Sequence, residues 1–171
     1  FIGNRSSGKQ GHAIAKALNN AGASVTLVSG PVKIPDPKGV KTLHIETAQE
    51  MLNACEDTLP ADIAICAAAV SDWRVKQTSD HKIKKREDKP TPTLSLSETP
   101  DILQTISRSK NRPALVIGFA AETENLIKNA QEKLNKKSCD WIIANNVAED
   151  QVFGSDENHV YLITNNETTE W

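Results

Sequence analysis

Residues 62–70 read Asp62-Ile63-Ala64-Ile65-Cys66-Ala67-Ala68-Ala69-Val70, a nearly continuous apolar run. A run of this kind is typical of a central parallel strand that is covered on both faces. Residues 114–120 form a second such run, and residues 140–144 predict the strand that follows it. These three segments predict the middle of a parallel sheet.

Helical patterns alternate with strand patterns on both sides of this centre. Residues 24–28 and 40–45 predict two more strands. A first helix precedes them and ends at Gly22. Its apolar residues at helical spacing are Ala13, Ile14, Ala17 and Leu18.

A second helix is predicted to begin at Thr47, because Thr47 and Glu50 form a capping box. Another helix lies between residues 120 and 140, and residues 160–163 predict an edge strand. The apolar residues of that later helix are Leu126, Ile127, Ala130 and Leu134. The alternation predicts an α/β fold: a Rossmann-like, doubly wound, mostly parallel sheet with helices on both faces, whose ligands bind at the carboxyl ends of the strands.

Composition narrows the function classes. The chain has 171 residues, 38% hydrophobic and 25% charged, which is enough for one globular domain. A net charge of -2 argues against a nucleic-acid partner, and no apolar run approaches the length of a membrane span. The three cysteines and four histidines lack metal-ligand spacing, so we expect a reducing cytoplasm and no protein-held metal.

The stretch Gly3-Asn4-Arg5-Ser6-Ser7-Gly8-Lys9-Gln10-Gly11 predicts an anion-binding loop that leads into the first helix. Its glycines allow close approach to a ligand, and the helix start offers free amides to a phosphate. It is not a standard P-loop, because Gln10 stands where the Mg²⁺-binding Ser or Thr belongs. The alternative is a Ser/Gly-rich turn that only caps the helix.

Four further features could serve a ligand or only the fold. Asp72 follows the run 62–70, where it could bind a ligand or cap a turn. Phe119 could stack on a base or fill the core. Cations also gather in two clusters, which could neutralise a triphosphate or form solvated faces. The first comprises Lys82, Lys84, Lys85 and Arg86, and the second Lys128, Lys133, Lys136 and Lys137.

Six segments, in order along the chain, together resemble phosphopantothenate-cysteine ligase, the synthetase part of the bacterial bifunctional coenzyme A biosynthesis flavoprotein. The segments are residues 3–11, 25–31, 68–73, 82–85, 118–123 and 144–147. The resemblance implies that 4'-phosphopantothenate attacks the α-phosphorus of a nucleoside triphosphate and that cysteine then displaces the nucleotide to form an amide. The Lys82-Ile83-Lys84-Lys85 form is similar to the bacterial type that uses CTP.

The resemblance also implies roles for single residues. Asn4 matches the Asn that holds the acyl nucleotide, and Lys82 matches the lysine of a mobile flap; both are expected to be catalytic. Nucleotide contacts are implied for Ser6, Gly8, Gly11, Ala68, Asp72, Lys82, Phe119, Lys133 and Lys137. Substrate contacts are implied for Asn4, Ala68, Ala69 and Asp72.

The resemblance further implies Mg²⁺ bound with the triphosphate, a cytoplasmic homodimer, and FMN only if a decarboxylase domain is fused upstream. We expect residues 1–171 to be one ligase domain that lacks the family's first strand and last helix. The alternative is a nicotinamide-dependent Rossmann oxidoreductase. It should show Gly-x-Gly-x-x-Gly after a strand and an acidic residue at the end of the next, where this chain has Ser29-Gly30.

Overall fold

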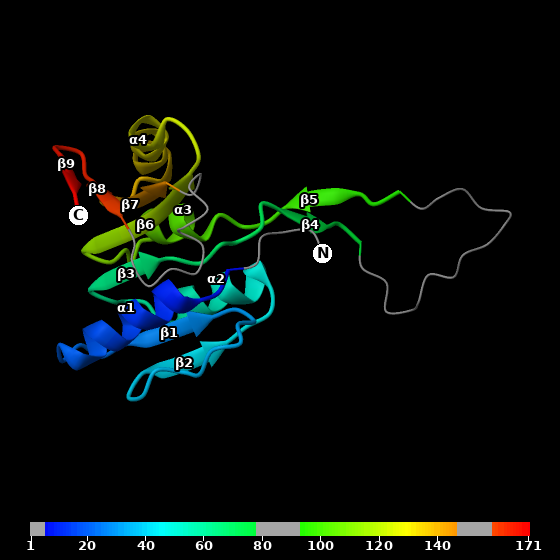
Figure 1. The fold of residues 1–171 in the computed structure, drawn as a ribbon. Coiled ribbons are helices and arrows are strands. Elements are labelled where there is room, and N and C mark those ends of the chain that lie inside the picture. The colour runs from blue at the N-terminus through cyan, green and yellow to red at the C-terminus, as the bar shows by residue number, and fades with distance from the viewer. Residues whose placement is uncertain (1–5, 78–92, 147–158) are drawn as a thin grey trace, which may run out of the picture.

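The computed structural model describes residues 6–77, 93–146 and 159–171, and within them an α/β arrangement (Figure 1). Asn4 and the cationic run 82–86 lie outside these described residues. The elements in chain order are α1 (Lys9–Asn20), β1 (Thr26–Ser29), β2 (Lys41–His44), α2 (Ala48–Asp57), β3 (Ile63–Cys66), β4 (Trp73–Val75), β5 (Leu96–Glu98), α3 (Ile102–Ser107), β6 (Leu115–Glu122), α4 (Leu126–Lys137), β7 (Trp141–Asn146), β8 (Val160–Ile163) and β9 (Thr168–Glu170).

The main sheet is mixed and has the strand order β3-β6-β7-β8-β9. The first three strands are parallel, with Ile63 opposite Leu115 and Ile117 opposite Trp141. β8 and β9 then pair antiparallel. The predicted α/β class is confirmed, but the sheet is less parallel than predicted, and β9 rather than β8 forms its outer edge.

β1 and β2 form a second, two-stranded parallel sheet. β3 is therefore at an edge of the main sheet, and the side chain of Ile63 is 49% exposed. The prediction of a central strand over residues 62–70 is wrong on this point. Among the described residues, no strand pairs with the second edge of β3. One edge of β3 therefore lacks the neighbouring strand that its apolar sequence predicts.

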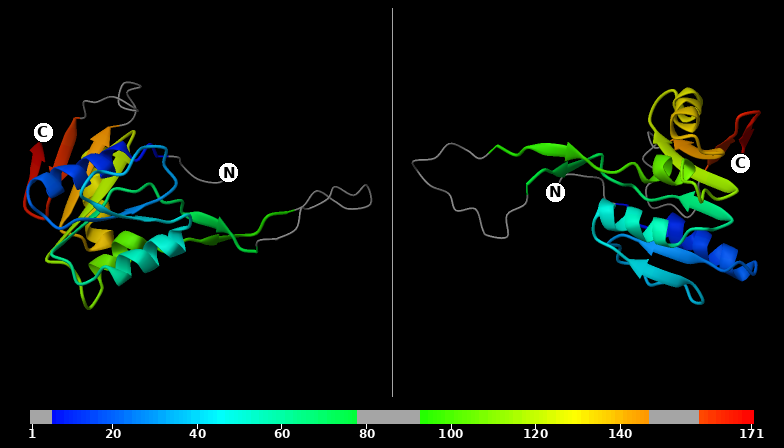
Figure 2. Two further views of the ribbon diagram at one scale, coloured as in Figure 1. Left: turned by 90° about the horizontal axis from the view of Figure 1, so that it is seen from below. Right: turned by 180° about the vertical axis from the view of Figure 1, so that it is seen from behind.

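Helices lie on both sides of the strands (Figure 2, left). On one side α2, α3 and α4 pack in sequence, with α4 against β6 and β7, whereas α1 packs against β1. The core lies between α2–α4 and the main sheet. The largest fully buried side chains of the described residues are Leu134, Ile142, Ile163, Val116 and Pro113.

Local signals place two of these helices. At α2 the Thr47 hydroxyl accepts from the Glu50 amide, while the Glu50 carboxylate accepts from the Thr47 amide, so the predicted capping box is confirmed. In α1 the buried residues are His12 and Ala15, with Ala13 and Ala17 exposed. The predicted helix is confirmed, and Ile14 and Leu18 among its apolar residues are half-buried.

β4 and β5 form a short antiparallel arm that projects from the body (Figure 1). The side chains of Trp73 and Leu96 on these strands are 50% and 41% exposed. At the root of the arm, Thr99 donates from its amide to the carbonyl of Asp72 at 3.0 Å and from its hydroxyl to the carbonyl of Ser71. The sequence patterns did not predict this arm.

Candidate functional site

Gly8 forms the turn at the start of α1. Its φ is 75° and its ψ is -7°, a left-handed conformation that favours glycine. An added Cβ would lie 2.8 Å from Cγ1 of Val32, so a side chain is excluded by space as well. The hydroxyls of Ser6 and Ser7 accept from the amides of Gly8 and Lys9 at 3.3 and 3.4 Å. The loop is a tight turn packed against the segment after β1.

Gly11 lies in the first turn of α1, and an added Cβ there would meet no atom within 4 Å. Among the described residues, the amides of Gln10 and Gly11 donate no hydrogen bond. These are donors that a helix leaves unsatisfied at its start, where the dipole also favours negative charge. Ser6, Gly8 and Gly11 therefore form one geometric unit suited to an anion.

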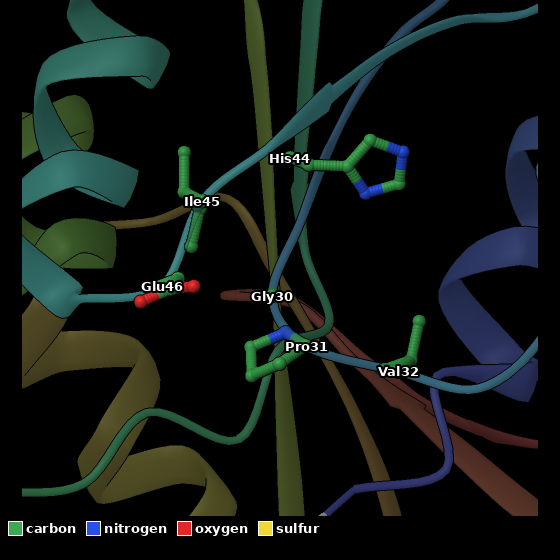
Figure 3. A pocket seen from close by; sticks show the side chains of 6 residues that line it. All are labelled: Gly30, Pro31, Val32, His44, Ile45 and Glu46. Carbon is green, nitrogen blue, oxygen red and sulfur yellow. The ribbon is translucent and has the colours of Figure 1, made fainter.

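A pocket of about 240 Å³ lies at the carboxyl ends of β1 and β2. Its lining residues are Gly30, Pro31, Val32, His44, Ile45 and Glu46 (Figure 3). Val32 belongs both to this lining and to the packing against Gly8, so the pocket adjoins the loop. Nε2 of His44 lies 3.0 Å from the Asp36 carboxylate, on an exposed surface.

Phe119 and Lys133 meet between β6 and α4. Nζ of Lys133 donates to the carbonyl of Phe119 at 2.6 Å. Burial lowers the pKa of Lys133, and the nearby charge of Lys137 lowers it further. Phe119 does not end its strand as expected, because β6 continues to Glu122; its side chain is half-buried.

Lys137 lies one turn along α4 from Lys133 and forms an ion pair with Asp101. Asp101 also caps α3, since its carboxylate accepts from the Gln104 amide at 3.1 Å. Burial raises the pKa of Asp101, but the hydrogen bonds from Lys137 and Gln104 outweigh it and leave the pKa below its usual value. Sequence reasoning missed Asp101; an Asp three residues before Gln104, at the start of a helix, was the available signal.

Ala68, Ala69 and Asp72 lie beyond the end of β3 and are exposed. The strand stops at Cys66, so the predicted strand end at residue 70 was placed too late. The backbone of Asp72 bonds to Thr99, two residues before Asp101. Asp72 is thereby held near the start of α3 through the root of the arm.

The structure thus brings the predicted residues into two groups. The loop group contains Ser6, Gly8 and Gly11, and the β6–α4 group contains Phe119, Lys133 and Lys137. No hydrogen bond or ion pair joins the two groups within the described ranges. Asn4 and Lys82, the two expected catalytic residues, lie outside those ranges.

Among the described residues the structure shows neither a metal-binding cluster nor a membrane-spanning helix. There, no group of three His, Cys, Asp or Glu residues is placed to hold a metal ion. Likewise, none of the described helices has the length and apolarity to cross a membrane.

The family described as DNA/pantothenate metabolism flavoprotein C-terminal domain matches residues 1–171. The chain belongs to this family. Membership in this flavoprotein C-terminal-domain family confirms the resemblance drawn from the six segments.

Individual curated proteins and solved structures are also similar to this chain. The chain is 42% identical over 167 residues to the coenzyme A biosynthesis bifunctional protein CoaBC of Haemophilus influenzae, covering 97% of this chain and 41% of that protein. It thus spans less than half the length of that curated relative. The crystal structure of the C-terminal domain of a CoaBC protein is 36% identical, with a TM-score of 0.78 over 98% of this chain and 74% of that one. A Cab2 mutant in complex with phosphopantothenate-cysteine, 16% identical, shares the fold with a TM-score of 0.74 over 98% of this chain and 72% of that one.

Proposed function

We propose that this domain is a phosphopantothenate-cysteine ligase that joins 4'-phosphopantothenate to cysteine through an acyl-cytidylate intermediate, at the expense of CTP. The observation that carries the proposal is the β6–α4 group, where Lys133 donates to the backbone carbonyl of Phe119 on β6 and Lys137 pairs with Asp101. Two cations one turn apart on α4 suit a nucleotide with a charged phosphate chain. Family membership supplies the reaction class.

The chemistry suits a site made of positioned donors. A carboxylate becomes a good acyl donor once its oxygen carries a phosphate leaving group, so the protein mainly has to orient reactants and neutralise oxyanions. We assign phosphate binding to the loop group and nucleotide binding to the β6–α4 group. Asn4 would donate to the acyl nucleotide without adding charge, and Lys82 would follow the phosphates.

Lys133 and Lys137 already have partners in this structure, the Phe119 carbonyl and the Asp101 carboxylate. To contact a phosphate each must share or exchange that partner. Lys133 suits the exchange, because burial already disfavours its charged form and an incoming anion would compensate it. Nucleotide binding should therefore raise the pKa of Lys133.

Magnesium would enter with CTP, coordinated mainly by phosphate oxygens and water, as Mg²⁺ retains waters readily. FMN would belong to a fused decarboxylase domain and not to this one.

We also propose that a further parallel strand joins β1 and β3 into one sheet and that the domain works as a homodimer. The first proposal rests on one edge of β1 and one edge of β3, which have no paired strand among the described residues. The second rests on the arm, whose exposed Trp73 and Leu96 would be covered by a second subunit. Sedimentation of the active protein tests the dimer; a fully active monomer would contradict it.

The reaction itself is tested by following pyrophosphate and CMP. Release of both from CTP should require phosphopantothenate and cysteine together, and ATP should replace CTP poorly. Continuous release of CMP without cysteine, or equal use of ATP, would contradict the amide-forming or the CTP-dependent part of the proposal, whereas one equivalent of pyrophosphate released without cysteine is the acyl-cytidylate step itself. Calorimetric titration with each nucleotide separates binding from turnover.

A further inference from the structure

His12 is a buried histidine at the start of α1 that the mechanism above does not use. Its side chain is 8% exposed. Nδ1 lies 3.0 Å from the carbonyl oxygen of Gly8, and the backbone amide of His12 donates to the same oxygen at 3.1 Å. A carbonyl oxygen only accepts, so Nδ1 must carry the hydrogen. The geometry places a hydrogen on Nδ1.

Gly8 is the residue whose orientation this pair of hydrogen bonds controls. As the N-cap of α1 it has no side chain to accept from the helix amides, and its left-handed backbone is set against Val32. In a trans peptide the carbonyl of one residue and the amide of the next point in opposite directions. Holding the Gly8 carbonyl toward the His12 ring therefore aims the Lys9 amide away from it, toward the loop.

The second ring nitrogen gives independent evidence that His12 does more than fill space. Nε2 is buried and has no hydrogen-bond partner among the described residues. A buried ring nitrogen without a partner is unfavourable, and an apolar ring of similar size would avoid that penalty. The bond from Nδ1 to Gly8 is the one polar contact that the His12 side chain makes in the described part of the chain.

We propose that His12 is a positioning residue for phosphate binding, which holds the Gly8 peptide so that the amides at the start of α1 face the phosphoryl group. The inference rests on the proposed function of the loop. If the Gly8 peptide turned over, its carbonyl oxygen would face the anion and repel it. The ligand chemistry is a phosphate chain, such as that of CTP or of inorganic tripolyphosphate.

Three substitutions separate the hydrogen bond from the volume of the ring. His12→Asn places an amide N–H close to the position of Nδ1, His12→Gln places one close to Nε2, and His12→Phe keeps the ring without a donor. The dissociation constants for CTP and tripolyphosphate should rise about fivefold in His12→Phe and His12→Gln, the usual effect of one net hydrogen bond. In His12→Asn they should stay within about twofold of the native protein.

Thermal stability should follow a different order, which a purely structural role would not produce. His12→Phe removes the unpartnered nitrogen and should be at least as stable as His12→Asn, although it binds more weakly. Nitrogen NMR of the native protein should show the Nδ1–H tautomer, and tripolyphosphate should shift the amide signals of Gly8, Lys9 and Gly11.

The outcomes distinguish the two proposals. Equal affinities of the native protein and His12→Phe, or equal losses in His12→Asn and His12→Phe, would overturn the positioning role and leave the ligase proposal standing. A native protein that binds neither CTP nor tripolyphosphate would overturn both. A ring with hydrogen on Nε2 alone would contradict the hydrogen bond directly.

Discussion

Gly11→Ala separates a structural glycine from one required by a ligand. The new methyl group meets no atom within 4 Å, and the site is helical, so the variant should gain on the order of 0.5 kcal/mol of stability. In a domain of this size that gain raises Tm by about 1–2 °C. A phosphate seated on the first turn would meet the same methyl group. Losing one charge-assisted contact of about 1.5–3 kcal/mol weakens CTP binding by about 10- to 150-fold.

Gly8→Ala is the matched control, because there the fold itself requires glycine. The left-handed backbone costs about 1–2 kcal/mol for a residue with a Cβ, and contact with Val32 adds to it. Adding Val32→Ala to Gly8→Ala should relieve the steric clash with Val32 but leave the cost of the left-handed backbone. Thermal unfolding and CTP calorimetry measure both variants. Unchanged CTP affinity in Gly11→Ala would remove Gly11 from the phosphate site, and a lower Tm would refute its assignment to open space.

Three other outcomes follow from buried groups. Gly118→Ala should lose about 1–3 kcal/mol in urea unfolding, because its Cβ would lie 2.6 Å from Leu103 and 2.8 Å from Ile142; unchanged stability would mean that the neighbours move freely. Because the pKa of Asp101 is lowered in the folded protein, its carboxylate stabilises the fold at pH values above the ordinary pKa of 3.8, and this stabilisation is lost as the pH falls through the lower folded pKa. In Asp101→Asn the free energy of unfolding should therefore fall less steeply with decreasing pH than in the native protein. Parallel curves of stability against pH would contradict this. Burial raises the pKa of Cys66 to about 12, so iodoacetamide at pH 8 should modify it, by mass spectrometry, only after unfolding; rapid labelling of the native protein would count against this.

The features that the sequence predicted correctly are those set by neighbouring residues. The capping box of Thr47 and Glu50 needs only a local turn, and the apolar runs at β6 and β7 reflect burial on both faces. α3, with six residues, is too short for its periodicity to be detected. The antiparallel pairing of β8 and β9 depends on partners that no local pattern identifies.

In the candidate site, too, the residues could be predicted from the sequence but their tertiary contacts could not. The family resemblance supplied Phe119, Lys133 and Lys137, and the structure places them together. It could not supply the ion pair of Lys137 with Asp101, because 36 residues separate the two along the chain. The half-buried position of Phe119 in mid-strand likewise depends on the continuation of β6, which the pattern of residues 114–120 understated.

The bonds from Thr99 to Ser71 and Asp72 give the arm a mechanical connection to the β6–α4 group. The two bonds join the chain segments that enter and leave the arm, and Thr99 is two residues before Asp101, the cap of α3 and the partner of Lys137. The root of the arm and the ion pair are therefore close along the chain, and we expect a displacement of β4 and β5 to reach the end of α3 at which the carboxylate and the lysine meet.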